Sequence, residues 1–150
     1  MNYRTLGKTG YKVSEISLGT WQLGSRWGDP FNEEVAMQTL EAAVANGINL
    51  FDTADIYQDG LSEPAIGRFL KANPDKEVFV VTKMGRDLNP HVAEGYNEKN
   101  LRGFVERSLR NQQRDALDLT LLHCPPTSVF SNKEVFAALD RMKSEGMVRH

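Results

Sequence analysis

Apolar residues follow two alternating patterns along the chain. Short, almost continuously apolar runs lie at residues 15–20, 48–51, 77–83 and 117–123. Each run precedes a longer segment with apolar residues three or four positions apart, starting near residues 33, 62, 97 and 131. The short runs predict buried strands, and the longer segments predict amphipathic helices. The pattern therefore predicts four consecutive strand–helix units.

Residues typical of helix ends support these segments. Ser62 is a candidate N-cap for the second helix, and Ser131 and Glu134 have capping-box spacing before the fourth. Gly47 and Gly146 stand where the first and fourth helices should stop. These positions predict helices of ordinary length in each unit.

Two further segments frame the four units. Residues 2–14, "NYRTLGKTGYKVS", contain two short stretches on either side of glycine-rich turn residues, which predicts a β-hairpin. The last residues, "MVRH" at 147–150, predict the opening of a fifth strand.

Near-continuous apolar strands joined by helices predict a parallel sheet covered by helices, with all strand carboxyl ends on one face. An open doubly wound sheet and a (β/α) barrel both fit. An open dinucleotide-binding sheet would usually carry G-x-G-x-x-G after its first strand, whereas residues 19–24 are "GTWQLG". We therefore expect an α/β fold of the (β/α)8 TIM-barrel type. Residues 1–150 would form one domain, a half barrel of about four βα units preceded by the hairpin.

Composition narrows the functional classes. The chain has 150 residues, 40% of them hydrophobic and 25% charged, which is typical of a globular domain. A net charge of -2 argues against binding to nucleic acid or an anionic membrane. We find neither a signal peptide nor an apolar span of about 20 residues, and expect a cytoplasmic protein. The single cysteine, Cys124, excludes an internal disulfide and a cysteine-built zinc site, and we predict no metal.

Polar residues stand where three successive predicted strands end. Asp52 ends the second strand, Lys83 the third and His123 the fourth, while Tyr57 lies in the loop after the second. Parallel strands place such ends side by side, on the face where barrel enzymes build their active sites. We therefore expect the four side chains to converge.

These residue types suit proton delivery to a carbonyl. An isolated phenol has a pKa of about 10, too high for efficient acid catalysis near neutrality. A lysine ammonium at about 4 Å stabilises a phenolate by up to about 4 kcal/mol at a surface-like dielectric. Asp52 would keep Lys83 charged and oriented, and His123 would donate a hydrogen bond to the carbonyl oxygen. Hydride from a nicotinamide is the natural complement, because no side chain supplies it.

Each residue also has an ordinary structural explanation. Asp52 could cap a turn, and Tyr57 could be an amphipathic loop residue. Lys83 could be a solvated strand end, and His123 a hydrogen-bonded packing residue. Their joint position at three successive strand ends raises the functional interpretation to the same standing as the structural one, and spacing alone leaves both open. A Schiff-base enzyme with Lys83 as nucleophile is a further alternative, which the nearby carboxylate of Asp52 disfavours.

The sequence also resembles the aldo-keto reductase family along nearly its whole length. The resemblance is carried by "YRTLGKTGYKVSEISLGTWQLG", "GINLFDTADIY", "SEPAIGRFL", "VVTKMG", "LRGFVERSLRNQQRDALDLTLLHCP" and "KSEGMVRH", in family order. It implies an NADPH-preferring oxidoreductase on a (β/α)8 barrel that reduces an aldehyde or ketone. By position, Tyr57 resembles the family's proton donor, Lys83 and Asp52 the pair that tunes its acidity, and His123 the residue that orients the carbonyl.

The resemblance also implies cofactor contacts. Gly19, Thr20 and Trp21 match the segment beside the nicotinamide, and Asp52 would approach the ribose. Gln58 stands where relatives commonly have glycine, which affects the shape of the loop. Trp21, Trp27 and Phe31 are candidates for an apolar wall near the site, although Trp27 and Phe31 could simply pack the loop.

Length is the larger departure from the family. Its barrel has eight βα units, and this chain stops just inside the fifth strand, so most of the cofactor site would be missing. A half barrel also leaves sheet edges and an apolar interior unpaired, so we expect self-association or a complementary half-barrel fragment, or else a chain that is only marginally folded. The alternative function is a catalytically silent, cofactor-sensing or interaction subunit derived from such a reductase.

Overall fold

The computed structural model describes residues 1–26 and 28–150. Its strands are β1 (Tyr3–Thr5), β2 (Lys12–Ser14), β3 (Leu18–Gly19), β4 (Leu50–Asp52), β5 (Phe79–Met84) and β6 (Leu119–Leu122). Its α-helices are α1 (Glu33–Ala45), α2 (Ser62–Ala72), α3 (Glu98–Gln112) and α4 (Lys133–Ser144). Two short 3-10 helices, η1 (Ala93–Gly95) and η2 (Thr127–Ser131), lie in the loops after β5 and β6.

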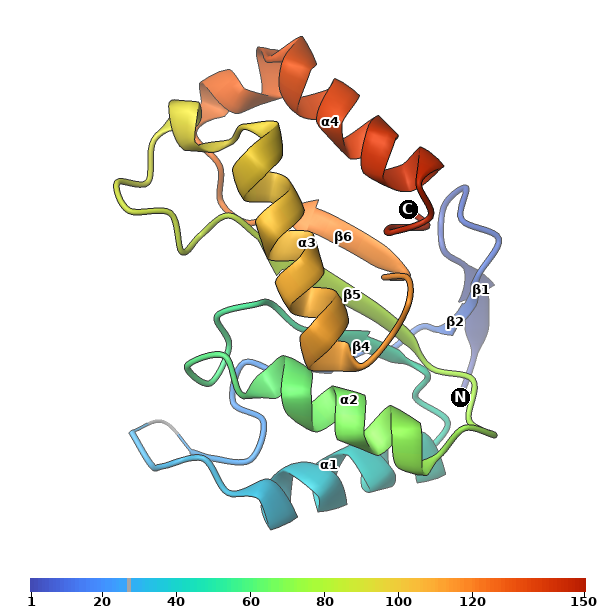
Figure 1. The fold of residues 1–150 in the computed structure, drawn as a ribbon. Helices are drawn as coiled ribbons and strands as arrows, with labels where there is room; N and C mark the ends of the chain where they lie inside the picture. Colours follow the sequence, from blue (N-terminus) through green and yellow to red (C-terminus); the bar gives the residue numbers. More distant parts are fainter. Residues whose placement is uncertain (27) are drawn as a thin grey trace.

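The strands form two sheets. β1 and β2 pair antiparallel as the predicted hairpin, and β3, β4, β5 and β6 form a parallel sheet in chain order. The four α-helices follow one another over one face of this sheet (Figure 1). The molecule is therefore an α/β partial barrel of four βα units after a hairpin, which confirms the predicted fold class.

Side-chain alternation along β5 separates the two faces of the sheet. Val80, Thr82 and Met84 are buried, whereas Val81 and Lys83 are partly exposed. Val80 packs in a core cluster with residues of α1 and α2, and Met84 in a second cluster with residues of α3 and α4. Val80, Thr82 and Met84 therefore face the helices. Val81 and Lys83 lie on the opposite face of the sheet, called here the inner face.

Two of the predicted helix caps are wrong. The α2 N-cap is Leu61, which has no polar side-chain atom and makes no capping bond, and the predicted cap, Ser62, has a buried hydroxyl that donates to the Thr20 hydroxyl at 2.9 Å. Before α4, Asn132 is the cap and accepts from the Glu134 N–H at 3.0 Å, and Ser131 belongs to η2. A side chain that meets a partner in the core is not available to its own helix end.

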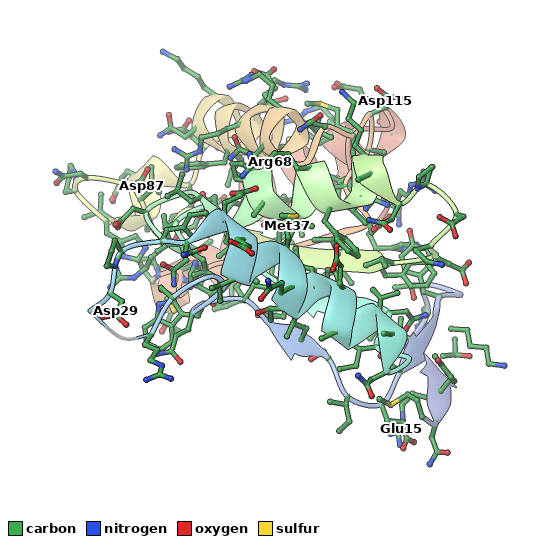
Figure 2. All side chains as sticks on the ribbon, turned by 90° about the horizontal axis from the view of Figure 1, so that it is seen from below. Glu15, Asp29, Met37, Arg68, Asp87 and Asp115 are labelled. Carbon is green, nitrogen blue, oxygen red and sulfur yellow. The ribbon has the colours of Figure 1, made fainter. Side chains whose placement is uncertain are left out.

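The hairpin and both chain termini lie at one end of the sheet, and the loops after β3, β4 and β5 lie at the other (Figure 1). Glu15, just after β2, and the loop residues Asp29 and Asp87 mark these two ends in Figure 2. The Tyr11 ring stacks on Phe79 at 4.3 Å between centroids and meets the His150 ring edge at 5.1 Å.

The predicted fifth strand begins as an isolated parallel bridge between Leu117 and Val148. The backbone continues the pairing, because Thr120 N–H donates to the His150 carbonyl at 2.9 Å. Among residues 1–26 and 28–150, no helix has the length and apolar character that crossing a bilayer requires.

Candidate active site

The predicted cluster of polar side chains assembles at the carboxyl ends of β4 and β5. Asp52 is aligned with Val81 in the sheet, so Lys83 stands two residues further along the neighbouring strand and on the same inner face. Lys83 Nζ donates to Asp52 Oδ1 at 2.6 Å, to the Thr53 carbonyl at 2.8 Å and to the Tyr57 hydroxyl at 3.2 Å. The side chain of Lys83 is only 16% exposed, so these three acceptors replace most of its water.

His123 completes the cluster from the next strand. The backbone N–H of His123 donates to the Met84 carbonyl at 2.8 Å, which extends the pairing of β5 and β6 by one residue. Its ring meets the Tyr57 ring edge-on, with centroids 5.8 Å apart. The four side chains that the sequence places at strand ends and in the following loop therefore lie together.

Burial controls the charge of His123. Desolvation, followed by repulsion from Lys83 and Arg86, lowers the pKa of His123 below its usual 6.5. The ring is therefore neutral at pH 7. Its Nδ1 atom is buried and meets no hydrogen-bonding partner among the described residues.

The segment after β3 lies directly beside Asp52. Gly19 is aligned with Asp52, and the Thr20 N–H and hydroxyl both donate to the Asp52 carbonyl at 2.9 Å. Thr20 is fully buried, so it holds the segment in place, whereas Gly19 is exposed and Trp21 is 57% exposed. Of the other aromatic candidates, Phe31 packs against the core, and Trp27 lies outside the described residues.

One buried ion pair in this region was not predicted. Asp55, two residues before Tyr57, has a side chain with no exposed surface and accepts from Arg107 Nη2 at 2.8 Å. Arg107, on α3, also donates to Asp87 at 3.1 Å. Desolvation raises the pKa of Asp55 to about 6, although the bond from Arg107 opposes the shift. The pair ties the loop that carries Tyr57 to the outer helix layer.

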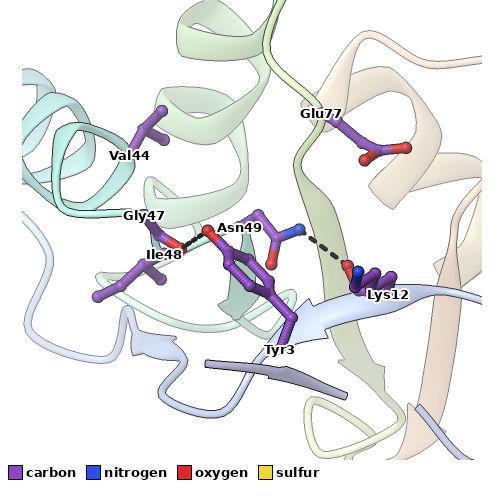
Figure 3. A pocket seen from close by; sticks show the side chains of 7 residues that line it. All are labelled: Tyr3, Lys12, Val44, Gly47, Ile48, Asn49 and Glu77. Carbon is purple, nitrogen blue, oxygen red and sulfur yellow. Dashed lines mark hydrogen bonds between the residues drawn. The ribbon is translucent and has the colours of Figure 1, made fainter. Parts of the chain in front are cut away.

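A hollow of about 360 Å³ lies at the opposite end of the sheet (Figure 3). It is lined in part by Tyr3, Lys12 and Asn49, near the start of β4. The Tyr3 hydroxyl donates to the Gly47 carbonyl at 2.9 Å, and the Asn49 amide donates to the Lys12 carbonyl at 3.0 Å. These polar groups hold the hairpin against the sheet, so this hollow is separate from the cluster around Tyr57.

The chain is similar in sequence to a known family of proteins. A sequence profile of the Aldo/keto reductase family matches residues 15–150. The chain is 36% identical to L-galactose dehydrogenase of Arabidopsis thaliana over 97% of its own length and 46% of that protein.

Solved structures give the same result. The aldo-keto reductase AKR11C1 of Bacillus halodurans, in its holo form, superimposes with a TM-score of 0.83 at 31% identity, over 100% of this chain and 49% of that one. An aldo-keto reductase of Klebsiella pneumoniae in complex with NADPH gives a TM-score of 0.75 at 27% identity, over 94% and 45%. The chain thus spans about half the length of these relatives.

Proposed function

Because the chain belongs to the aldo/keto reductase family, we propose that it carries the proton-transfer part of an oxidoreductase site that reduces an aldehyde or ketone. The observation that carries this proposal is the 3.2 Å hydrogen bond from Lys83 Nζ to the Tyr57 hydroxyl. The substrate would be a small molecule with a carbonyl group.

Tyr57 is the proposed proton donor. Its O–H proton would pass to the carbonyl oxygen, leaving a phenolate beside the Lys83 ammonium. At 3.2 Å and an effective dielectric of about 20, that attraction is about 5 kcal/mol before desolvation costs. Asp52, 2.6 Å from Nζ, would hold the ammonium in place during the transfer. A Schiff-base role for Lys83 is disfavoured. Nζ donates hydrogen bonds to three acceptors, which uses all three N–H groups of an ammonium, whereas a nucleophile needs a neutral amine with a free lone pair.

His123 is the proposed electrophilic residue. A neutral imidazole carries one N–H, and the buried Nδ1 atom, which meets no partner among the described residues, could not present that N–H to a substrate. We therefore assign the proton to Nε2. The Nε2–H group would donate to the carbonyl oxygen and orient it beside the Tyr57 hydroxyl.

The cofactor of the proposed reaction is a nicotinamide dinucleotide, which supplies hydride when bound. The residues at the strand ends fit such a group: Gly19 is exposed, with open space where a Cβ would stand, and Asp52 keeps 39% of its side chain exposed. We propose that Gly19 and Trp21 contact the nicotinamide ring and that Asp52 contacts the ribose. Thr20, which is buried, would hold this segment in place through its bonds to the Asp52 carbonyl. NADPH is the proposed form, rather than NADH, and the NADPH complex of the Klebsiella pneumoniae relative supports this choice.

The open inner face of the sheet favours association. Leu121, on this face, is 44% exposed, and β3 pairs only with β4 among the described residues. We propose that a second copy or a complementary half-barrel fragment covers this face. Sedimentation of the purified chain tests the proposal: dimers or larger species are expected, and a stable monomer contradicts it.

The same open face favours a second candidate function, a catalytically silent subunit that senses a cofactor or binds a partner. One experiment separates the two functions. NADPH is titrated into the purified chain, and oxidation of NADPH is then followed with an aldehyde in the same sample. Turnover supports the reductase, whereas binding without turnover supports the silent subunit. Absence of both contradicts a cofactor role for this chain alone.

A further inference from the structure

The loop that carries Tyr57 has an unusual backbone. Gln58 and Asp59 have φ values of 54° and 52°, and Gly60 follows at 84°. The left-handed region is open to glycine but rarely adopted by residues with a Cβ atom. Strained backbone of this kind persists only where the surrounding contacts hold it in place. At Gln58 such contacts are visible.

The Gln58 side chain bridges two loops. Its Nε2 donates to the Trp21 carbonyl at 2.7 Å, and its Oε1 accepts from the Ser25 hydroxyl at 3.0 Å. Both partners belong to the segment after β3, whereas Gln58 is next to Tyr57 in the loop between β4 and α2. A single amide thus connects the proposed proton donor's loop to the neighbouring loop.

The bridged segment, residues 20–25, is anchored at both ends. At one end, buried Thr20 donates to the Asp52 carbonyl, and its own carbonyl accepts from Leu23 N–H at 3.1 Å. At the other end, Gly24 has φ 74°, and a Cβ there would stand 2.6 Å from the Asn32 carbonyl oxygen. Between these ends, Trp21 is 57% exposed. The two bonds from Gln58 therefore fix the exposed part of the segment.

We propose that Gln58 is a positioning residue that fixes the Trp21-bearing segment at a set distance from Tyr57 and so limits the size of the carbonyl substrate. This inference rests on the proposed function, because it takes the space between Trp21 and Tyr57 as the substrate entrance. The side-chain bonds of Gln58 offset the strain of its backbone. A glycine at position 58 would adopt the same backbone without strain but would remove both side-chain hydrogen bonds to the segment.

Tryptophan fluorescence tests the bridge without any need for turnover. The chain has two tryptophans, Trp21 and Trp27, so the signal reports on this part of the chain alone. In Gln58→Gly, the acrylamide quenching constant is expected to rise about twofold because the exposed part of the segment loses its two hydrogen bonds to Gln58. Asp59→Gly is the matched control, because it relieves similar strain and leaves the Gln58 amide intact. Its quenching is expected to match that of the wild type.

Ser25→Ala removes one of the two bonds. It should give a smaller increase in quenching, and it should add nothing in the Gln58→Gly background, because the partner atom is already gone. Unchanged quenching in Gln58→Gly, or an equal rise in Asp59→Gly, would overturn the bridge.

Substrate selection is tested on the same variants with acetaldehyde and benzaldehyde. In Gln58→Gly, the ratio of kcat/KM for benzaldehyde to that for acetaldehyde is expected to rise about fivefold, because the larger aldehyde is admitted more easily. The rise should come mainly from a lower KM for benzaldehyde. Increased quenching with an unchanged ratio would overturn the role in substrate selection. A wild-type chain that reduces neither aldehyde contradicts the proposed function instead. The quenching measurement then still tests whether Gln58 holds the segment, because it needs no turnover.

Discussion

Arg107, on α3, donates a 2.8 Å hydrogen bond to Asp55, which stands two residues before Tyr57 in the loop after β4. The contact joins the outer helix layer to the loop of the proposed proton donor, across 52 positions of sequence. A second bond to Lys83 fixes the same loop, because Asp55 N–H donates to the Lys83 carbonyl at 3.2 Å. The position of the Tyr57 phenol therefore depends on a helix as well as on the strands.

Removing the guanidinium should destabilise the fold. In Arg107→Met, the buried Asp55 carboxylate loses its cation, and we expect the free energy of unfolding at pH 8 to fall by about 3 kcal/mol. The loss should be smaller at pH 5, where Asp55 is protonated in either protein. Urea denaturation at both pH values measures it. Arg110→Met, an exposed arginine on the same helix, is the control, and an equal loss there would contradict the assignment.

Asp55 should also make stability depend on pH. Burial raises its pKa to about 6 from an ordinary 3.8, so the folded state binds a proton more tightly than the unfolded state does. Its contribution is then fully present below pH 4 and is lost as pH rises through 6. Arg107, Glu63 and Asp87 are the charged groups that act on this carboxyl.

The measurement compares wild type with Asp55→Asn from pH 4 to pH 7. The unfolding free energy of the wild type should fall relative to the variant by about 2.4 kcal/mol over this range, since one pKa unit is worth about 1.4 kcal/mol and the unfolded carboxyl is already partly ionised at pH 4. A difference that stays constant over this range, or that grows in favour of the wild type, would show that Asp55 titrates normally.

Two glycines in helices provide a matched test of the packing that positions Arg107. A Cβ at Gly67, on α2, would lie 2.4 Å from the Asn111 carbonyl oxygen on α3, whereas a Cβ at Gly103 would meet nothing within 4 Å. Gly67→Ala should therefore lower the melting temperature, with a loss of about 1–3 kcal/mol in the free energy of unfolding. Gly103→Ala should be neutral or stabilising by up to about 1 kcal/mol. Equal melting temperatures for the two variants would contradict this description of the α2–α3 contact.

Strand order and side-chain alternation made much of the cluster predictable from sequence. In a parallel sheet with neighbouring strands consecutive in the chain, Asp52, Lys83 and His123 must reach the same edge. Alternation then places Asp52 and Lys83 on the same face, because each stands an odd number of positions from a buried neighbour, Phe51 and Val80 respectively. The position of Tyr57 near this edge is also predictable, because only four residues separate it from Asp52.

The Asp55–Arg107 pair could not be predicted in the same way. No strand register relates the two residues, and the face that α3 turns toward the loop depends on how closely it packs against α2. That distance is set by Gly67 against the backbone of Asn111, a contact that no periodic pattern reveals. The role of Ser62 was predicted wrongly for a similar reason. A capping rule uses only neighbouring residues in the sequence, whereas Ser62 bonds to Thr20, which is distant in the sequence.

The central claim is that Tyr57 delivers the proton, and replacing its hydroxyl alone tests this most directly. Reduction of an aldehyde and the Kd for NADPH are measured on wild type, Tyr57→Phe and the control Tyr3→Phe, whose hydroxyl bonds Gly47 at the other end of the sheet. The account predicts that kcat falls by about 10²–10⁴ in Tyr57→Phe, with an unchanged Kd and an unaffected control. A Tyr57→Phe variant that reduces the aldehyde at the wild-type rate, or that loses activity only because it no longer binds NADPH, would contradict it.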